Sequence, residues 1–320
     1  MPIPSISELT TTTIAQRSGE ISDNVTVNTA LLVRMREKGN IEMLSGGEEI
    51  YRELSYAENT NTGWYSGADT LPVAAQNVLT SAVFPWKQLS TQIVYTGAEK
   101  LKNSGKEQII NLVESRIKNA KASMLNEMQR SLYSDGTRFG GKELTGLDLA
   151  IPVDPTTGTY GGIARADFSF WRPQVYDAAA TPTATTIVPY MNALWNRLVR
   201  GTDRPDLIAF GQNLYSTYEA SQQQFQRFTN SKMAQAGFES LKYKDADVLL
   251  ENVGCGDDEG FFVNTTYFKL SVHKDRNMVP IDGANATRAP VNQDAEVVIL
   301  GFFGNLTCSN SSLQGRFIGS

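Results

Sequence analysis

The sequence predicts an α+β protein organised around one unusually long helix. Residues 104–135 carry apolar side chains at steps of three or four, which is the period of an α-helix. Residues 46–97, directly before this helix, are polar and strand-like, and the residues after it interleave helix and strand without a regular βαβ alternation. These three observations favour the α+β class over a doubly wound sheet.

The predicted long helix has one apolar stripe and one charged face. At about 1.5 Å per residue it would span on the order of 45 Å. The stripe consists of Ile109, Val113, Ile117, Ala120, Met124, Met128 and Leu132. The opposite face carries Lys106, Glu114, Arg116, Lys118, Lys121, Glu127 and Arg130. Because only the stripe needs a protein partner, we expect the helix to lie across a sheet or a neighbouring subunit.

Residues 1–45 are predicted to form an N-terminal arm. The arm begins with a run rich in Ser and Thr, followed by a helix-compatible segment over 30–38 that Gly39 closes. It has too few apolar residues to pack on itself, so we expect it to depend on other parts of the assembly for order.

Residues 46–97 are predicted to form a long open hairpin. Apolar and polar residues alternate over 50–56 and again over 88–95, which is typical of two strands. The tip, residues 59–69, is rich in turn-forming residues around Trp64 and Tyr65. This aromatic pair could bind a partner, or it could collapse onto the stem of its own hairpin, and the sequence leaves both readings open.

The residues after the long helix predict a mixed domain. Residues 136–184 are rich in Gly, Pro and Thr, with Phe168, Phe170 and Trp171 as expected anchors. The elements expected after them are a helix over 187–199 ended by Gly201, a buried strand over 204–210, a helix from 213, and strands at 248–250, 260–266, 268–273 and 296–303.

Composition excludes several classes of protein. The chain has 320 residues, of which 41% are hydrophobic, enough for a substantial core. A net charge of −5 does not favour tight binding to nucleic acid or to an anionic membrane. No membrane-length apolar run and no signal-peptide pattern occurs. Cys255 and Cys308 are far apart in the sequence and are expected to be free thiols.

The sequence offers little catalytic chemistry. His273 is the single histidine, and no nucleophile-elbow pattern accompanies it, so a structural role is expected. Asp257, Asp258 and Glu259 could hold a cation, but they are consecutive, whereas calcium loops space their ligands at alternate positions. We therefore expect an acidic turn here, and no catalytic, cofactor or metal site.

The order of arm, long loop, long helix and mixed domain resembles the Hong Kong 97-like major capsid proteins of tailed bacteriophages. Residues 189–200 followed by 204–218 look like that family's helix, strand and helix in the axial domain, and residues 238–270 are similar to its run of strands. Residues 273–278 and 295–306 resemble its last strands in the peripheral domain. The resemblance covers nearly the whole chain.

The resemblance implies a division of the chain into five parts. Residues 1–45 would be the N-terminal arm, 46–97 the extended loop, 98–148 the peripheral domain with its spine helix, 149–289 the axial domain, and 290–320 the C-terminal strands returning to the peripheral domain.

The resemblance also implies a function without catalysis. The chain would assemble with many copies of itself, as hexamers and pentamers, into the icosahedral capsid of a virion, formed in the host cytoplasm. Because the arm is short, a separate scaffold protein is expected. Further implied partners are a portal protein, a decoration protein and, weakly, packaged double-stranded DNA, with no membrane. The residues expected to contact neighbouring subunits are Trp64, Tyr65, Glu48, Arg52, Lys118 and Arg130.

Two other functions compete with this reading. A hydrolase using two carboxylates, with Asp257, Asp258 or Glu259 as candidates, would be a compact monomer with an acidic and aromatic pocket. A tail-tube subunit is the second alternative, although the long helix counts against it.

Overall fold

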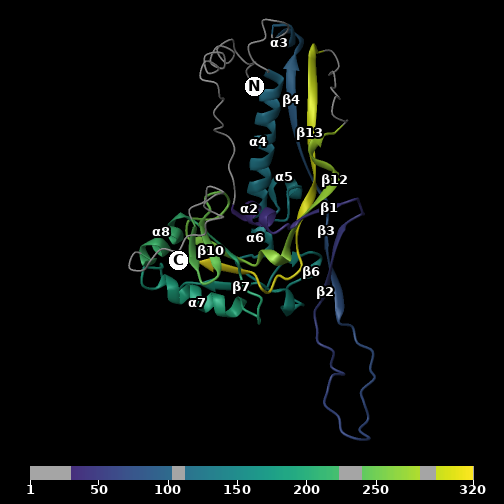
Figure 1. Ribbon diagram of the computed structural model, residues 1–320, viewed down its shortest axis with the longest axis vertical. Helices are drawn as coiled ribbons and strands as arrows, with labels where there is room; N and C mark the ends of the chain where they lie inside the picture. Colours follow the sequence, from purple (N-terminus) through teal and green to yellow (C-terminus); the bar gives the residue numbers. More distant parts are fainter. Residues whose placement is uncertain (1–29, 103–111, 223–239, 282–292, 320) are drawn as a thin grey trace.

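The computed structural model describes residues 30–102, 112–222, 240–281 and 293–319 (Figure 1). One part of the molecule is elongated, with a long helix lying beside long strands. A second part combines a mixed sheet with two helices, and a narrow two-stranded hairpin extends away from both.

Helix α4 (Leu112–Tyr133) is the predicted long helix, which we call the spine helix. Ala120, Met124, Met128 and Leu132 are buried, as the predicted stripe requires, and Ile117 packs against the same core. The segment contains neither Gly nor Pro and is rich in good helix formers. The helix ends two residues before the predicted end. Residues 104–111 and the side chain of Val113 lie outside the described part of the chain.

The spine helix packs along β4 (Lys87–Thr96), an edge strand of a four-stranded sheet. The sheet has the order β1-β12-β13-β4, with β1 (Ile41–Leu44) parallel to β12 (Phe268–Pro280) and the other pairs antiparallel. Strand β13 (Ala295–Cys308) pairs with β4 from Ala295 opposite Thr96 to Gly304 opposite Lys87. Ile93 and Tyr95 of β4 are buried, while Gln92 and Val94 are exposed, which confirms the predicted alternation.

The hairpin prediction is wrong about which strand pairs with residues 50–55. Strand β2 (Ile50–Ser55) pairs with β3 (Leu79–Phe84), and not with residues 88–95, which form β4 of the sheet above. Alternation identified both strands but could not say which strand each one joins. Strand β3 itself was missed. Residues 56–78 connect β2 to β3 without regular secondary structure.

A six-stranded mixed sheet forms the centre of the second part. Its order is β7-β14-β11-β8-β10-β9. The strands are β7 (Gln174–Asp177), β14 (Gly315–Ile318), β11 (Glu259–Val263), β8 (Leu207–Phe210), β10 (Ala246–Leu250) and β9 (Ser240–Tyr243). Helices α7 (Ile187–Leu198) and α8 (Gln212–Gln222) cover one face.

Strand β8 is buried on both faces, as predicted. Ile208 and Phe210 face the core under α7 and α8, while Leu207 and Ala209 face the larger core that includes the spine helix. Successive side chains of a strand point to opposite faces, so this one strand contributes to both cores. The six-stranded sheet therefore joins the two parts of the molecule.

Two of the implied domain boundaries differ from the sheets observed. Strand β12 lies within the implied axial range 149–289 but pairs in the four-stranded sheet, as the resemblance of 273–278 to peripheral strands implies. Strand β14 lies inside the six-stranded sheet, so residues 290–320 do not all return to the peripheral sheet. A long β12–β13 hairpin followed by a final strand explains both differences.

The described end of the predicted arm is part of the core. In α2 (Ala30–Glu37), Leu31, Leu32 and Met35 are buried, and β1 then adds to the edge of β12. Gly39 closes this helix at φ +69°, a conformation that glycine adopts without steric cost. Val33, Ile41 and Leu44 pack against the same core, so this part of the arm is ordered by the larger core and does not have to pack on itself. Residues 1–29 lie outside the described part.

The Gly- and Pro-rich stretch after the spine helix contains short elements. They are α5 (Arg138–Gly141), α6 (Leu147–Ala150), β5 (Thr159–Tyr160), β6 (Ile163–Ala164) and a 3-10 helix, η3 (Ser169–Trp171). Trp171 is buried and Phe170 packs against the core, as expected. Phe168 is exposed and does not act as an anchor. Two short helices complete the described chain. Helix α3 (Gly97–Lys102) follows β4, and the 3-10 helix η4 (Thr265–Tyr267) directly precedes β12.

Candidate assembly interface

The base of the extended loop is fixed to the body of the subunit. Ile50, Leu54, Ala82 and Phe84 are buried on the inward face of β2 and β3. Burying each large apolar side chain contributes about 1.5–3 kcal/mol, enough to hold the stem in one orientation.

Arg52 ties the same base to the four-stranded sheet. Its Nε donates to Thr307 Oγ1 at 3.0 Å, and its Nη2 donates to Ser271 Oγ and to Glu42 Oε2, both at 2.6 Å. The side chain is only 14% exposed. Arg52 was predicted to contact a neighbouring subunit; the contacts described here lie within its own subunit, and the inter-subunit role stays a prediction. The alternation of β2 places Arg52 on the inward face with Ile50 and Leu54.

Residues 158–171 pack against the base of the stem. The backbone N–H of Val83 donates to the carbonyl of Gly161 at 2.9 Å. The ring of Phe84 meets that of Tyr160 edge to face at 5.2 Å, and the ring of Tyr56 stacks on Phe170 at 5.4 Å. The loop is therefore held firmly as far as Tyr56.

Beyond Tyr56 the loop is held by hydrogen bonds between its own two sides. Asn61 Nδ2 donates to the carbonyl of Ala74 at 2.7 Å, and the backbone N–H of Thr60 donates to Gln76 Oε1 at 2.8 Å. Trp64 at the tip is fully exposed, and Val73 is 91% exposed. The aromatic pair therefore does not collapse onto its own stem, which was one of the two readings of the sequence.

The remaining predicted contact residues lie at separate places. Tyr65 is exposed beside Trp64, and Glu48 is exposed at the start of the loop. Lys118 is exposed on the spine helix, and Arg130, 58% exposed on the same helix, lies 3.6 Å from Glu127. The structure does not bring these residues into one cluster, so they would have to serve different contacts.

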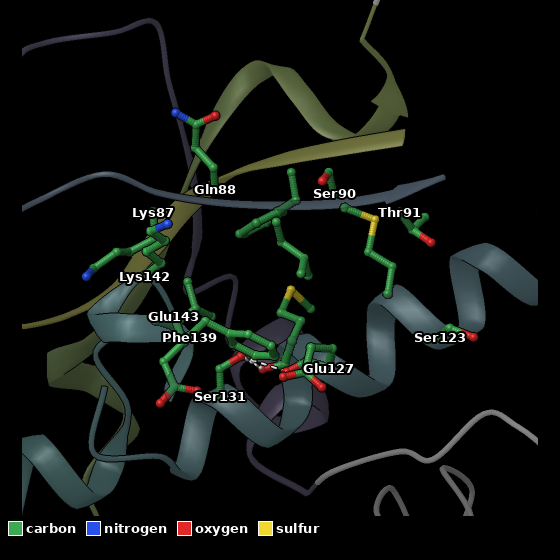
Figure 2. Close-up of a pocket in the computed structure, with 15 residues that line it drawn as sticks. Lys87, Gln88, Ser90, Thr91, Ser123, Glu127, Ser131, Phe139, Lys142 and Glu143 are labelled. Carbon is green, nitrogen blue, oxygen red and sulfur yellow. Dashed lines mark hydrogen bonds between the residues drawn. The ribbon is translucent and has the colours of Figure 1, made fainter. Parts of the chain in front are cut away.

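Sequence reasoning missed a groove between the spine helix and β4. Figure 2 shows its walls, with β4 along one side and the helix along the other. The groove has a volume of about 440 Å³. Its apolar lining comes from Leu89, Met124, Met128, Phe139, Leu144 and Phe302. Its polar rim includes Lys87, Gln88, Ser90, Ser123, Glu127, Lys142 and Glu143.

Phe139 lies at the edge of this groove in an unusual conformation. Its φ of +53° places a non-glycine residue in the left-handed region, which costs about 1–2 kcal/mol. The side chain is nevertheless 65% exposed, with the Arg138 guanidinium 5.1 Å from the ring centroid. Gly140 and Gly141 follow in the same conformation, and Lys87 Nζ donates to the carbonyl of Gly141 at 2.5 Å. The adjacent glycines Gly140 and Gly141, which follow an aromatic residue, were the sequence signal that could have indicated this left-handed turn.

The carboxylates at the groove are already matched by cations. Arg138 Nη2 lies 2.7 Å from Glu127 Oε1, and Arg138 Nη1 lies 3.6 Å from Glu143 Oε2. Partial burial lowers the pKa of Lys87 below its usual value. Lys142 is exposed at the rim. The surplus charge of the groove is therefore positive.

A second ion cluster attaches α2 to the six-stranded sheet. Arg34 Nε lies 3.2 Å from Asp206 Oδ2, Arg34 Nη2 lies 3.2 Å from Asp247 Oδ2, and Lys38 Nζ lies 2.9 Å from Asp206 Oδ2. Asp206 also accepts the backbone N–H and hydroxyl of Thr265. The two carboxylates raise the pKa of Arg34 against the opposing effect of burial, which is the largest single influence on it. These ion pairs hold α2 against the six-stranded sheet.

The acidic triplet has structural roles. The carbonyl of Asp257 accepts the backbone N–H of Asn213 at the start of α8, and Asp258 Oδ1 accepts Asn213 Nδ2 at 3.0 Å. Glu259 Oε2 lies 2.5 Å from Arg316 Nη2. In the described ranges no group of three or more His, Cys, Asp or Glu side chains is arranged to hold a metal ion.

His273 and the cysteines also lie in structural surroundings. The His273 ring packs near Trp86 and Phe303, and its Nδ1 accepts the backbone N–H of Asp275 at 3.2 Å. Both cysteines are buried free thiols, and burial raises the pKa of each thiol to about 12. Thiols with such pKa values remain protonated near neutral pH and are poor nucleophiles. None of the described helices has the length and apolar character needed to cross a membrane.

Comparisons with known proteins place the fold. No family model matches the sequence, and no curated protein matches it. The structure is similar to the chain of the cyanophage A-1(L) capsid asymmetric unit, with a TM-score of 0.70 and 14% identity over 95% of this chain and 97% of that chain. It is similar to the holo-SrpI encapsulin complex from Synechococcus elongatus PCC 7942, with a TM-score of 0.57 and 8% identity over 99% and 96% of the two chains. It is also similar to the capsid of Myoviridae phage XM1, with a TM-score of 0.52 and 12% identity over 96% and 98%.

These similarities confirm the predicted class and fold. The chain has an α+β, Hong Kong 97-like capsid fold along nearly its whole length. At these identities the likeness concerns the fold, and function has to be argued from the surfaces of the chain itself.

Proposed function

We propose that this chain is the shell-forming major capsid protein of a tailed bacteriophage. The observation that carries the proposal is the match to the cyanophage A-1(L) capsid chain, which extends over 95% of this chain at a TM-score of 0.70. A match of this extent includes the extended loop and the spine helix as well as the mixed domain. The subunit would work by binding to further copies of itself.

The form of the extended loop supports self-association. Its base is anchored by Arg52 and by buried apolar residues, while its tip presents Trp64, Tyr65 and Val73 to solvent. A rigid stem that holds exposed apolar side chains away from the body cannot bury them within its own subunit. Large aromatic residues of this kind often dominate the binding energy of protein interfaces.

The same proposal extends to partners that a capsid subunit would need. Copies of the chain would form hexamers and pentamers in the host cytoplasm and then remain in the virion capsid. A separate scaffold protein, a portal protein and a decoration protein would complete assembly, and packaged double-stranded DNA would make weak contacts. The acidic net charge of −5 supports weak rather than tight contact with DNA.

Other functions have less support. The hydrolase reading has weaker candidates, because the Asp258 carboxylate accepts a hydrogen bond from Asn213 of α8 and Glu259 pairs with Arg316. A tail-tube subunit is not supported by capsid-like structure along the whole chain. An encapsulin subunit would share the fold. The TM-score to the encapsulin complex, 0.57, is lower than the 0.70 to the cyanophage capsid chain, so this function is the second candidate.

Electron microscopy of the purified chain tests the proposal. The chain would be expressed alone and together with its genomic neighbours, and each sample would be analysed by negative staining and by sedimentation. Closed shells, or rings of five and six subunits, are expected in at least one condition. Small uniform particles in both conditions would overturn the proposal.

A loop variant makes the same test specific. Deleting residues 59–69 should block closed shells while the subunit remains folded by circular dichroism, since the deleted residues are exposed. The control is Val153→Ala, which changes an exposed apolar residue outside the loop and should assemble normally. Normal shells from the deletion variant would show that the loop is not an assembly element.

A further inference from the structure

We infer that residues 158–171, which we call the brace, set the angle at which the extended loop leaves the subunit, and that this angle selects the size of the shell. Tyr56 is the positioning residue, because the loop leaves its last support there. The inference rests on the proposed function and adds to it a determinant of particle size that lies within one subunit.

The brace is firmly packed although its elements are short. Trp171 is 1% exposed, and its Nε1 donates to the carbonyl of Tyr160 at 2.9 Å. The rings of these two residues also stack, with centroids 6.0 Å apart. Arg172, the next residue along the chain, donates to the carbonyls of Arg165 and Ala166 at 2.7 and 2.6 Å. Close packing and satisfied carbonyls leave this segment few alternative conformations.

Arg165 fixes the brace to the body of the subunit. The residue is only 1% exposed, and its Nη2 donates to the carbonyls of Leu149 and Ala150 in α6, at 2.6 and 3.0 Å. Its guanidinium lies 5.4 Å from the ring centroid of Tyr160. A buried charge is costly without its hydrogen-bond acceptors, so the brace cannot shift along α6 without a large loss of free energy.

The extended loop meets the brace at three points, and Tyr56 is the outermost of them. Two contacts, at Val83 and Phe84, lie at the base of the loop. The third is the stack of Tyr56 on Phe170, with ring centroids 5.4 Å apart. Within the described part of the chain, the hydrogen bonds of residues 57–77 join these residues to one another or to Tyr56. Rotation of the loop against the body therefore takes place at Tyr56.

A small rotation at Tyr56 becomes a large displacement at the tip, which projects far beyond β2 and β3 (Figure 1). An extended chain spans at most about 3.6 Å per residue, so Trp64 can lie up to about 29 Å beyond Tyr56. A rotation of about 12° moves a point at that distance by about 6 Å. Side chains are in contact only when their heavy atoms lie within about 4.5 Å, so this displacement changes which groups meet on the next copy.

A rotation of the same size separates the two kinds of ring in the proposed shell. Copies joined head to tail close into a ring when the rotation between neighbours is about 60° for six copies and about 72° for five. The number of rings of six placed between the rings of five decides the diameter of a closed shell. A brace that confines the loop to a narrow range of angles therefore restricts assembly to one diameter, whereas a loose loop permits several.

Spin-label distances in the unassembled subunit test the action of the brace. Labels at Ser66→Cys in the tip and Ser169→Cys in the brace report the angle between the two segments, because both serines are exposed and the native cysteines are buried. Tyr56→Ala should at least about double the width of the distance distribution, because it removes the outermost stack. Tyr56→Phe keeps the ring and should leave the width unchanged.

The matched control for this measurement is Tyr51→Ala. Tyr51 is an exposed tyrosine of β2, so its replacement is the same chemical change in the same stem without loss of the stack. Its distance distribution should equal that of the unmodified chain. Equal widths in the Tyr56→Ala and Tyr51→Ala variants would overturn the inference.

Electron microscopy of assembled variants tests the effect on size. Shells of the unmodified chain and of Tyr56→Phe should share one diameter, whereas Tyr56→Ala should give more than one diameter or open sheets. Shells of a single unchanged diameter from Tyr56→Ala would overturn the inference and leave the proposed function standing. Failure of the unmodified chain to form any shell would instead overturn the proposed function, and the spin-label distances would still show whether the brace fixes the loop.

A second variant keeps the test decisive if Tyr56→Ala does not fold or does not assemble. Phe170→Leu removes the same stack from the side of the brace and leaves an apolar side chain against the core. It should give the same broadening of the label distances and the same mixture of shell diameters. An unchanged width, or a single unchanged diameter, would overturn the inference.

Discussion

Arg52 of β2 and Glu42 of β1 form an ion pair, with Nη2 and Oε2 2.6 Å apart. The pair joins the first strand of the extended loop to the edge strand of the four-stranded sheet. Arg52 also donates hydrogen bonds to Ser271 and Thr307, whose residues are completely buried. The direction of the loop is therefore set within the subunit before any neighbour is met.

Replacing Arg52 should destabilise the subunit itself. Arg52→Met leaves the Ser271 and Thr307 hydroxyls without this donor and Glu42 without its ion pair, so the free energy of unfolding should fall by about 1.5–3 kcal/mol. Urea unfolding of the unassembled subunit measures the loss. The control is Arg130→Met, an exposed arginine with a single long ion pair, which should change stability by less than about 0.5 kcal/mol. An Arg52 variant of normal stability that failed to assemble would instead support the predicted inter-subunit role.

The spine helix should depend on its apolar stripe and not on its charged face. Met128→Ala removes a buried side chain from the larger core and should cost about 2–5 kcal/mol of unfolding free energy. Lys121→Ala on the exposed face of the same helix is the control and should be nearly neutral. Equal losses from the two variants, measured by chemical denaturation, would show that the stripe is not the buried face.

In the turn between β5 and β6, alanine should be more costly at one glycine than at its neighbour. Gly161 and Gly162 both have positive φ, +57° and +73°. A Cβ on Gly161 would lie 2.9 Å from Ala82 Cβ at the loop base, whereas a Cβ on Gly162 would approach nothing closer than 3.9 Å. Gly161→Ala should therefore lose about 1–3 kcal/mol more than Gly162→Ala. Similar melting temperatures for the two variants would contradict the close contact between this turn and the loop.

Stability should decrease at alkaline pH because of the buried thiols. Burial raises the pKa of Cys308 to about 12, whereas an unfolded thiol titrates near about 8.5. Between these values the folded chain binds more protons than the unfolded chain, so the free energy of unfolding is constant below the lower value and falls as pH rises through the window. Cys308→Ala should reduce this slope by up to about 1.4 kcal/mol per pH unit. Urea titrations from about pH 7 to about pH 10 measure it, and an unchanged slope would show that the thiol does not contribute.

Thiol labelling gives an independent check on the same feature. The native protein should not react with a maleimide at neutral pH, whereas the unfolded chain should take up two labels, because both cysteines are buried and free. Rapid labelling of the native protein would contradict the burial of Cys255 and Cys308.

The sequence predicted those features that have a short period along the chain. The stripe of Ala120, Met124, Met128 and Leu132 identified the buried face of the spine helix, and alternation identified β2 and β4 as strands. The turn-forming residues around Trp64 identified the tip of the loop, and the structure decided between the two readings of the aromatic pair by leaving Trp64 exposed. These properties depend on neighbours within a few residues, so they can be read from consecutive positions.

Tertiary structure alone decided which strands pair. Strand β4 joins β13, with Thr96 opposite Ala295, although an open hairpin with β2 fitted its alternation equally well. Strand β14 has four residues and no clear period, and its Arg316 is stabilised there by Asp148 and Glu259 from distant parts of the chain. Alternation tells which face of a strand is buried but carries no information about the strand beside it.

The division between the two sources of information therefore has a physical basis. The sequence by itself determined the α+β class, the spine helix and the alternation of its strands, because each depends on local periodicity. Only the tertiary structure decided that Arg52 faces its own sheet, that α2 belongs to the core, and that Phe139 lies at the edge of a groove. These outcomes depend on contacts between residues far apart in the chain, and such contacts exist only once the two sheets and the spine helix have packed together.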